Sequence, residues 1–197
     1  MAISSPIRLV AGLGNPGRAY VNTRHNAGFW FADALGATLR TSFAPEAKFE
    51  GEVAKAGNVR LAKPMRFMNL SGRCVASLAR FFDIASDEIL VVHDELDLRP
   101  GEIKMKFGGG HAGHNGLRDI EASIGSADFW RLRVGIGHPR DSEFAQQPVV
   151  DYVLRPPGSD EKTAIDAALD RALAAWPDIA AGDMERAMMA LHTKEKK

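Results

Sequence analysis

Two side chains in this sequence have the chemistry that general acid–base catalysis needs. His25 lies in the run Thr23-Arg24-His25-Asn26, and Asp94 directly follows the apolar residues 89–92 and His93. A free imidazole has a pKa of about 6.5, so that near neutral pH it can accept a proton from water. A carboxylate on the other ring nitrogen fixes the tautomer and stabilises the imidazolium that forms. The sequence therefore predicts a general base, His25, oriented by Asp94.

Three asparagines could complete such a site. Asn15 follows the first apolar run of the chain, and Asn69 and Asn115 each stand at the start of a helical pattern. Their amide N–H groups can donate to an oxygen that becomes negative during acyl transfer. The sequence holds no G-x-S-x-G motif, and its single cysteine, Cys74, stands in an apolar helical stripe. We therefore expect water to be the nucleophile, without an acyl-enzyme.

A glycine motif offers a different interpretation. Residues 12–17, Gly-Leu-Gly-Asn-Pro-Gly, match the G-x-G-x-x-G pattern of dinucleotide-binding folds. Pro16 has no N–H group to offer a phosphate, and it moves the preceding residue away from helical geometry. The acidic residue expected about 20 positions later would be Asp33, which falls inside a predicted helix. The pattern therefore favours a tight turn at the end of a strand.

A metal site is a second alternative. His111 and His114 are three positions apart and could combine with the carboxylates of residues 93–97. No H-E-x-x-H motif or cysteine pair accompanies them. Structural roles also stay open, because a histidine at a helix start, such as His25, is often a cap or a solvated ring. Asn69 and Ser71 can likewise be caps of the helix that follows them.

Strands and helices alternate along the chain and must bring these residues together. We predict strands at 7–13, within 51–63 as a pair broken at Gly57-Asn58, and at 89–93, 102–107 and 131–136; helices are expected at 25–35, around 75–82, at 115–124, from Ser159 as N-cap to 176, and at 178–191. This alternation predicts a single-domain, three-layer α/β/α fold over residues 1–197, with the C-terminal helices, about 159–191, packed on it. The short connections within 51–63 and between 93 and 102 predict hairpins, so the central sheet should be mixed but mostly parallel.

Composition and charge bound the class of protein. Hydrophobic residues make up 45% of the chain, no apolar run approaches the length of a membrane span, and no export signal precedes residue 7. One cysteine fits a reducing cytoplasm. The net charge is zero, which alone disfavours a nucleic-acid partner, but residues 1–80 hold 11 Lys/Arg against 4 Asp/Glu. A local basic face that contacts phosphates is therefore compatible with the sequence.

Several motifs occur in a fixed order through residues 7–155, and together they resemble one family. They are residues 12–17 with Tyr20, 23–28, Phe-Met-Asn-Leu-Ser-Gly at 67–72, His-Asp-Glu-Leu-Asp at 93–97, the glycine-rich 108–117, 131–139 and Tyr-Val-Leu at 152–154. This series resembles the bacterial-type peptidyl-tRNA hydrolase family. Residues 156–197 match only in being helical. The stretch 140–150, which varies in the family, is expected to form part of a mobile cover over the cleft, and the role of Arg66 stays open.

The resemblance implies a monomeric, cytoplasmic enzyme that cleaves the ester between a peptide and tRNA, without metal or other cofactor. His25 would be the proton acceptor, Asp94 would keep it basic, and Asn15 would distinguish N-blocked esters from free aminoacyl esters. The resemblance assigns contact with the end of the tRNA to Tyr20, Phe67, Asn69 and Asn115, with Met68 and His114 nearby, and phosphate binding to Lys106 and Arg133. An RNA-binding module without catalysis is the competing hypothesis.

Overall fold

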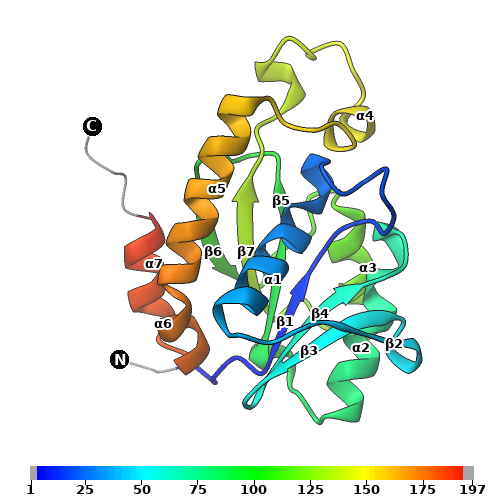
Figure 1. Ribbon diagram of the computed structural model, residues 1–197, viewed down its shortest axis with the longest axis vertical. Coiled ribbons are helices and arrows are strands. Elements are labelled where there is room, and N and C mark those ends of the chain that lie inside the picture. The colour runs from blue at the N-terminus through cyan, green and yellow to red at the C-terminus, as the bar shows by residue number, and fades with distance from the viewer. Residues whose placement is uncertain (1–3, 193–197) are drawn as a thin grey trace.

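The computed structural model describes residues 4–192 and contains a seven-stranded sheet. Across the sheet the strand order is β2-β3-β4-β1-β5-β7-β6 (Figure 1). The strands are β1 (Leu9–Gly12), β2 (Ala44–Glu46), β3 (Gly51–Ala56), β4 (Val59–Pro64), β5 (Ile89–Glu95), β6 (Ile103–Phe107) and β7 (Trp130–Gly135). β3 and β6 run antiparallel to the other strands. The sheet is therefore mixed and mostly parallel, as the sequence predicts.

Helices cover both faces of the sheet. They are α1 (Ala27–Thr38), α2 (Ser71–Phe81), α3 (Asn115–Ile124), α4 (Val149–Val153), α5 (Ser159–Ala174), α6 (Trp176–Ala181) and α7 (Met184–His192), with short 3-10 turns η1 (Arg24–Asn26), η2 (Ala47–Phe49), η3 (Met68–Leu70), η4 (Ser86–Glu88) and η5 (Pro139–Asp141). None of the helices within residues 4–192 has the length and apolar character to cross a membrane.

Two apolar cores lie between these layers, because side chains alternate along each strand. Val10 and Leu90 point to the face covered by α1, α5, α6 and α7, whereas Leu9 and Val91 point to the face covered by α2 and α3 (Figure 1). All four side chains are fully buried. The predicted three-layer α/β/α architecture is confirmed.

One of the two predicted hairpins is confirmed and the other is wrong. β3 and β4 pair in antiparallel fashion around Gly57, whose φ of 59° is a conformation that glycine adopts without strain. β5 and β6 do not pair, because β7 lies between them. β7 is buried at five of six positions, while β6 exposes Lys106 and Phe107. The more buried strand is therefore the central one, and the strand with the exposed Lys106 lies at the edge.

The ends of the predicted helices also need correction. Gly158, not Ser159, is the N-cap of α5, and its N–H donates to the Glu161 carboxylate at 2.7 Å. The helix predicted at 178–191 is two helices, α6 and α7, which separate at Gly182 with a φ of 81°. The helix predicted at 25–35 begins as the 3-10 turn η1 and continues as α1 to Thr38.

Candidate active site

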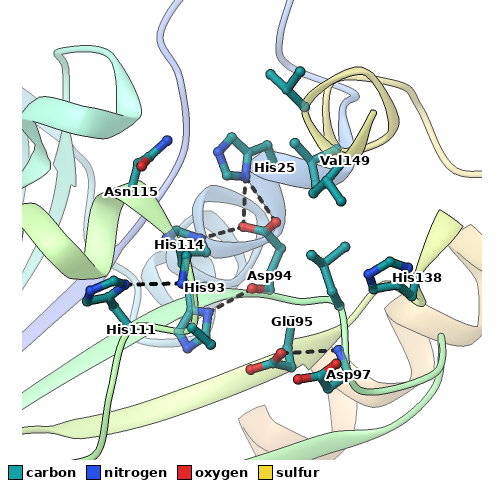
Figure 2. A pocket seen from close by; sticks show the side chains of 15 residues that line it. His25, His93, Asp94, Glu95, Asp97, His111, His114, Asn115, His138 and Val149 are labelled. Carbon is teal, nitrogen blue, oxygen red and sulfur yellow. Dashed lines mark hydrogen bonds and ion pairs between the residues drawn. The ribbon is translucent and has the colours of Figure 1, made fainter. Parts of the chain in front are cut away.

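A pocket of about 510 Å³ opens at the carboxyl ends of the central strands (Figure 2). Its walls come from the end of β5, the turn η1, the loop before α3, and α4. Parallel strands direct their carboxyl ends to one edge of a sheet, so residues far apart in the sequence meet there. His25, Asp94 and His114, which the sequence places on three separate segments, all line this pocket.

A glycine sets how closely His25 approaches the sheet. Gly28, in the first turn of α1, packs against the main chain of β1 and β5. A Cβ atom at this position would lie 2.3 Å from the Leu13 nitrogen and 2.3 Å from the Val92 oxygen. Only a residue without a side chain permits this contact between backbones. As a result, the turn that precedes α1 holds His25 beside the end of β5.

His25 and His114 both bond to the Asp94 carboxylate. The Nδ1 atom of His25 lies 3.0 Å from each carboxylate oxygen, and the Nε2 atom of His114 lies 2.9 Å from Oδ1. The side chain of Asp94 is 2% exposed and that of His25 is 14% exposed. Figure 2 shows the second ring nitrogen of His25 turned away from Asp94. The Nδ1–H group therefore serves the carboxylate, and Nε2 is left for a substrate or water.

The three groups shift one another's proton affinity. Burial alone would raise the pKa of Asp94, but the charges and hydrogen bonds of His25 and His114 hold that pKa well below its usual range. Burial alone would lower the pKa of His25, but the charge and hydrogen bond of Asp94 outweigh it and raise that pKa above 6.5. Asp94 is thus a permanent anion that makes His25 a stronger base.

The hydrogen bonds of His114 fix its tautomer as well. Its Nδ1 atom accepts from the Leu117 N–H at 3.4 Å as the N-cap of α3, so that Nε2 carries the proton that faces Asp94. The nitrogens of both histidines that face the carboxylate are therefore protonated in this arrangement. The ligand atoms of His25, Asp94 and His114 lie within 4.8 Å of one another.

The metal set suggested by the sequence is not assembled within residues 4–192. The grouping with metal-ligand spacing there is His25, Asp94 and His114, without His111. The Nδ1 atom of His111 instead accepts from the Gly113 N–H at 3.1 Å, within its own loop.

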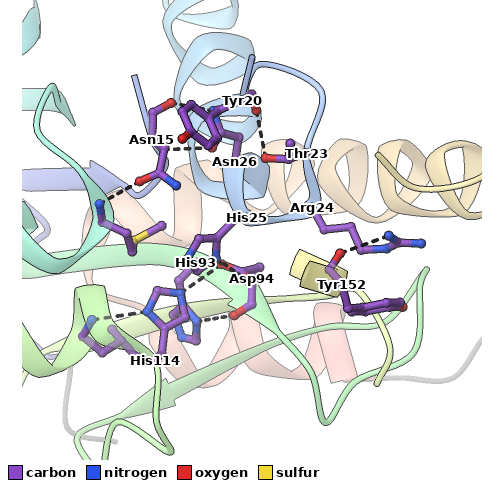
Figure 3. A network of polar contacts seen from close by, with 12 residues as sticks. Asn15, Tyr20, Thr23, Arg24, His25, Asn26, His93, Asp94, His114 and Tyr152 are labelled. Atoms are coloured by element: carbon purple, nitrogen blue, oxygen red, sulfur yellow. Dashed lines mark hydrogen bonds and ion pairs between the residues drawn. The ribbon is translucent and has the colours of Figure 1, made fainter. Parts of the chain in front are cut away.

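Asn15 lies on the side of His25 away from Asp94, where a network of hydrogen bonds between amide groups holds it (Figure 3). Its main-chain N–H and C=O pair with the side-chain amide of Asn26 at 2.9 and 3.0 Å. Its own Oδ1 accepts from the Met68 N–H at 2.7 Å. Because the oxygen is used in this way, the NH₂ group of Asn15 is left as a donor on the side of the amide that faces His25. The residues of the glycine motif thus form a tight turn that positions an amide, as the turn interpretation expects.

The sequence matches a family model described as peptidyl-tRNA hydrolase over residues 9–197. This chain belongs to the peptidyl-tRNA hydrolase family. It is 57% identical to the peptidyl-tRNA hydrolase of Bordetella avium over 98% of this chain and 94% of that protein, and 54% identical to that of Neisseria meningitidis serogroup C over 98% and 100%. The crystal structure of peptidyl-tRNA hydrolase from Acinetobacter baumannii matches with a TM-score of 0.89 at 43% identity, covering 97% of both chains. The chain is accordingly a hydrolase of the peptidyl-tRNA ester.

In this peptidyl-tRNA hydrolase family member, one of the residues expected at the end of the tRNA, Asn115, lines the pocket, whereas Tyr20, Phe67 and Asn69 lie outside its lining. Phe67 is 57% exposed, and its ring stands edge-on to that of Tyr20 at 6.1 Å between centroids. Asn69 and Asn115 are exposed, whereas Met68 is buried beside Asn15. Exposed aromatic rings and amides suit contact with unpaired nucleotides.

The expected phosphate-binding pair lies on the α3 face of β6 and β7. Lys106 and Arg133 both line a second, smaller pocket of about 160 Å³, which adjoins the first through His93. Arg133 donates to the Glu95 carboxylate at 2.9 Å, so half of the pair is already neutralised. Lys106 is exposed and forms no ion pair with residues 4–192. The free cation of the pair is therefore Lys106.

Two residues of the site are missing from the sequence prediction. Asn26 pairs with the main chain of Asn15, and His93 donates from Nδ1 to the Asp94 carbonyl at 2.7 Å. Burial, together with the charge of His114, lowers the pKa of His93 to about 3, so that this ring is neutral. Both residues adjoin predicted site residues in the sequence, which is the signal that could have found them. Arg66, whose role the sequence leaves open, pairs with Glu50 at 3.0 Å.

Proposed function

We propose that His25 is the general base of peptidyl-tRNA hydrolysis and that Asp94 orients it. One observation carries this proposal: His25 Nδ1 lies 3.0 Å from both oxygens of a buried carboxylate, and the opposite ring nitrogen faces the pocket. This arrangement supplies a free lone pair at Nε2 and a neighbouring anion that stabilises the protonated ring.

The reaction then follows from these positions. Nε2 of His25 takes a proton from water while the water oxygen attacks the carbonyl carbon of the ester. The tetrahedral intermediate collapses, the bond from that carbon to the sugar oxygen of the tRNA breaks, and the His25 imidazolium returns the proton to that oxygen. Asp94 remains ionised throughout and offsets the positive charge on the ring. The amide groups of Asn15 and Asn115 are the candidate donors to the oxyanion.

Asn15 also supplies a means of selecting N-blocked substrates. Its NH₂ group can donate to the carbonyl of the peptide bond that precedes the ester. A free aminoacyl ester presents an ammonium group in that region, which offers only donors and carries a positive charge. The selection therefore follows from the orientation that the Met68 N–H imposes on the Asn15 amide.

The remaining roles concern the tRNA. Tyr20 and Phe67 provide aromatic surfaces for unpaired bases, and Lys106 with Arg133 provides positive charge for a phosphate. Asn69 and Asn115 donate to the acceptor end, supported by Met68 and His114. We further propose that residues 1–197 form one domain and that the enzyme acts as a monomer in the cytoplasm, without a metal or other cofactor.

The test measures release of N-acetylated amino acid from tRNA by the wild-type chain and by His25→Ala. We expect kcat to fall by about 10²–10⁴, the usual contribution of a general base, with tRNA binding retained. His138→Ala is the matched control, because His138 lines the same pocket but contacts neither Asp94 nor His25. Equal rates for the wild type and His25→Ala would remove the proposed base. If the wild-type chain left the ester intact, the result would favour an RNA-binding module without catalysis.

A further inference from the structure

Arg24, the neighbour of His25 in the sequence, has no part in the chemistry described above. It is nevertheless 1% exposed, and it is among the largest fully buried side chains between residues 4 and 192. Burial of a guanidinium is costly unless its charge and its N–H groups find partners. The partners of Arg24 therefore indicate what its burial accomplishes.

These partners come from one distant stretch of the chain (Figure 3). Nη1 donates to the main-chain oxygens of Tyr152 at 3.2 Å and Arg155 at 3.4 Å, and Nη2 donates to the Glu161 carboxylate at 2.9 Å. The guanidinium carbon lies 4.1 Å from the centroid of the Tyr152 ring. In addition, the main-chain N–H of Arg24 donates to the Arg155 oxygen at 3.0 Å. Arg24 thus connects η1 to the end of α4 and the beginning of α5.

The stretch that Arg24 holds forms one wall of the pocket. Val149, Val150 and Val153 of α4 line it, and Val150 is 59% exposed (Figure 2). α4 has only five residues, so hydrogen bonds within the helix contribute little to its stability. Its other polar attachment is the Tyr152 hydroxyl, which donates to the Ile136 oxygen beyond β7 at 2.8 Å. Tyr152 and Val153 also anchor α4 in the apolar core, and Arg24 adds the direct connection between α4 and the turn that carries His25.

We propose that Arg24 is a positioning residue that fixes this valine wall opposite His25 and so governs how the peptide part of the substrate binds. The inference rests on the function proposed above. An apolar wall beside the scissile ester suits the side chains of the last residues of the peptide, which differ between substrates and can be bound only by non-directional contacts. The polar groups around His25 act on the ester itself, whereas α4 contacts the peptide residues that precede the ester.

Lysine cannot replace arginine in this role. The flat guanidinium donates in three directions and stacks on Tyr152 at the same time, whereas an ammonium is a single, strongly hydrated point of charge. Arg24→Lys therefore keeps the positive charge and removes the planar group that makes the three hydrogen bonds and stacks on Tyr152. Glu161→Gln keeps the geometry and removes the opposing charge, which gives a second, independent way to weaken the same connection.

The first experiment follows amide hydrogen exchange in residues 149–155. In Arg24→Lys and Glu161→Gln we expect these amides to exchange at least about tenfold faster than in the wild type, while β1 and β5 keep their protection. Arg8→Lys is the matched control. Arg8, at the opposite end of β1, likewise donates to two main-chain oxygens and one carboxylate. The acceptors are the main-chain oxygens of Phe82 and Asp83 and the side chain of Glu88. Unchanged exchange in both variants would overturn the proposal.

The second experiment separates binding from chemistry in the same variants. We expect KM to rise about tenfold for tRNA esters of apolar tripeptides and less for N-acetylglycyl-tRNA, with kcat and the pH midpoint of the acidic limb of kcat unchanged, because the His25–Asp94 contact is retained. A fall in kcat with a shifted midpoint would place Arg24 in the support of His25 and overturn a role at the wall. A wild-type chain without hydrolase activity would refute the proposed function, whereas the exchange experiment would still decide the role of Arg24.

Discussion

Replacing Asp94 by asparagine tests the proposed mechanism most directly, because the change preserves shape and removes charge. In the wild type, the two carboxylate oxygens accept from His25 Nδ1 and from His114 Nε2. An asparagine has one accepting oxygen and one donating nitrogen. If its nitrogen faces His25, the proton of that ring must move from Nδ1 to Nε2, and the lone pair that takes a proton from water is lost. If its nitrogen faces His114, donor meets donor there, and His25 keeps its tautomer without the neighbouring anion.

Both arrangements reduce the rate. We expect kcat to fall by about 10²–10⁴, which corresponds to about 3–5 kcal/mol in the activation free energy at 1.36 kcal/mol per tenfold. The pH profile should change in a definite direction. Activity requires neutral His25 and therefore rises as the pH rises through its pKa. Because Asp94 raises that pKa above 6.5 in the wild type, its replacement should move the acidic limb to lower pH.

The assay is single-turnover hydrolysis of an N-acetylated aminoacyl-tRNA between pH 5 and 9. Asp97→Asn serves as the control, because this carboxylate is exposed and bonds to neither histidine. A rate for Asp94→Asn within a few-fold of the wild type would refute the proposed role of the carboxylate. An acidic limb that moves to higher pH would refute the inferred electrostatics.

Three further outcomes are expected. Lys106→Ala should raise KM for the tRNA substrate and lower the slope of log affinity against log salt by about 1, as expected for the loss of one phosphate contact; an effect on kcat alone would contradict that assignment. Treatment of the enzyme with EDTA should leave kcat unchanged, and a loss that Zn²⁺ reverses would support a metal mechanism. Burial, with a smaller effect from Glu50, raises the pKa of Cys74 to about 12, so at pH 8 a thiol reagent should label it at least about 100-fold more slowly in the native chain than in urea, and equal rates would contradict its burial.

The layers of the fold and most of its elements follow from local sequence patterns. Residues 89–92 are a short apolar run and residues 131–136 have apolar side chains at alternate positions, and both stretches become central strands. The stripe from Val75 to Phe82 becomes α2. Their faces follow from alternation along strands and the helical repeat, which neighbouring residues determine. Gly57 likewise marks a turn by its own conformational freedom.

The pairing of strands does not follow from such patterns. Nothing between residues 95 and 103 shows that β7 will lie between β5 and β6, because that choice compares the burial of three strands at once. The short β2 and α4 are also absent from the prediction. Each is stabilised by contacts with distant segments and has little regularity of its own: β2 pairs with β3, and α4 is held through Arg24.

The candidate site divides in the same way. Strand ends and unusual polar residues are sufficient to single out His25, Asp94 and Asn15, while the resemblance adds the contacts to tRNA. The bond of His114 to Asp94 is visible only in three dimensions, since it depends on how the loop before α3 folds back over β5. The buried position of Arg24 is likewise invisible in the sequence, where an arginine is expected to be exposed.

The contact between α1 and the sheet at Gly28 has a consequence for mutation. A single added methyl group there would meet the Leu13 nitrogen and the Val92 oxygen, which belong to main chain and cannot rotate away. The helix would have to withdraw, and the imidazole that precedes it would withdraw as well. Replacing Gly28, even by alanine, is therefore expected to disturb the reaction although His25 and Asp94 are both unchanged.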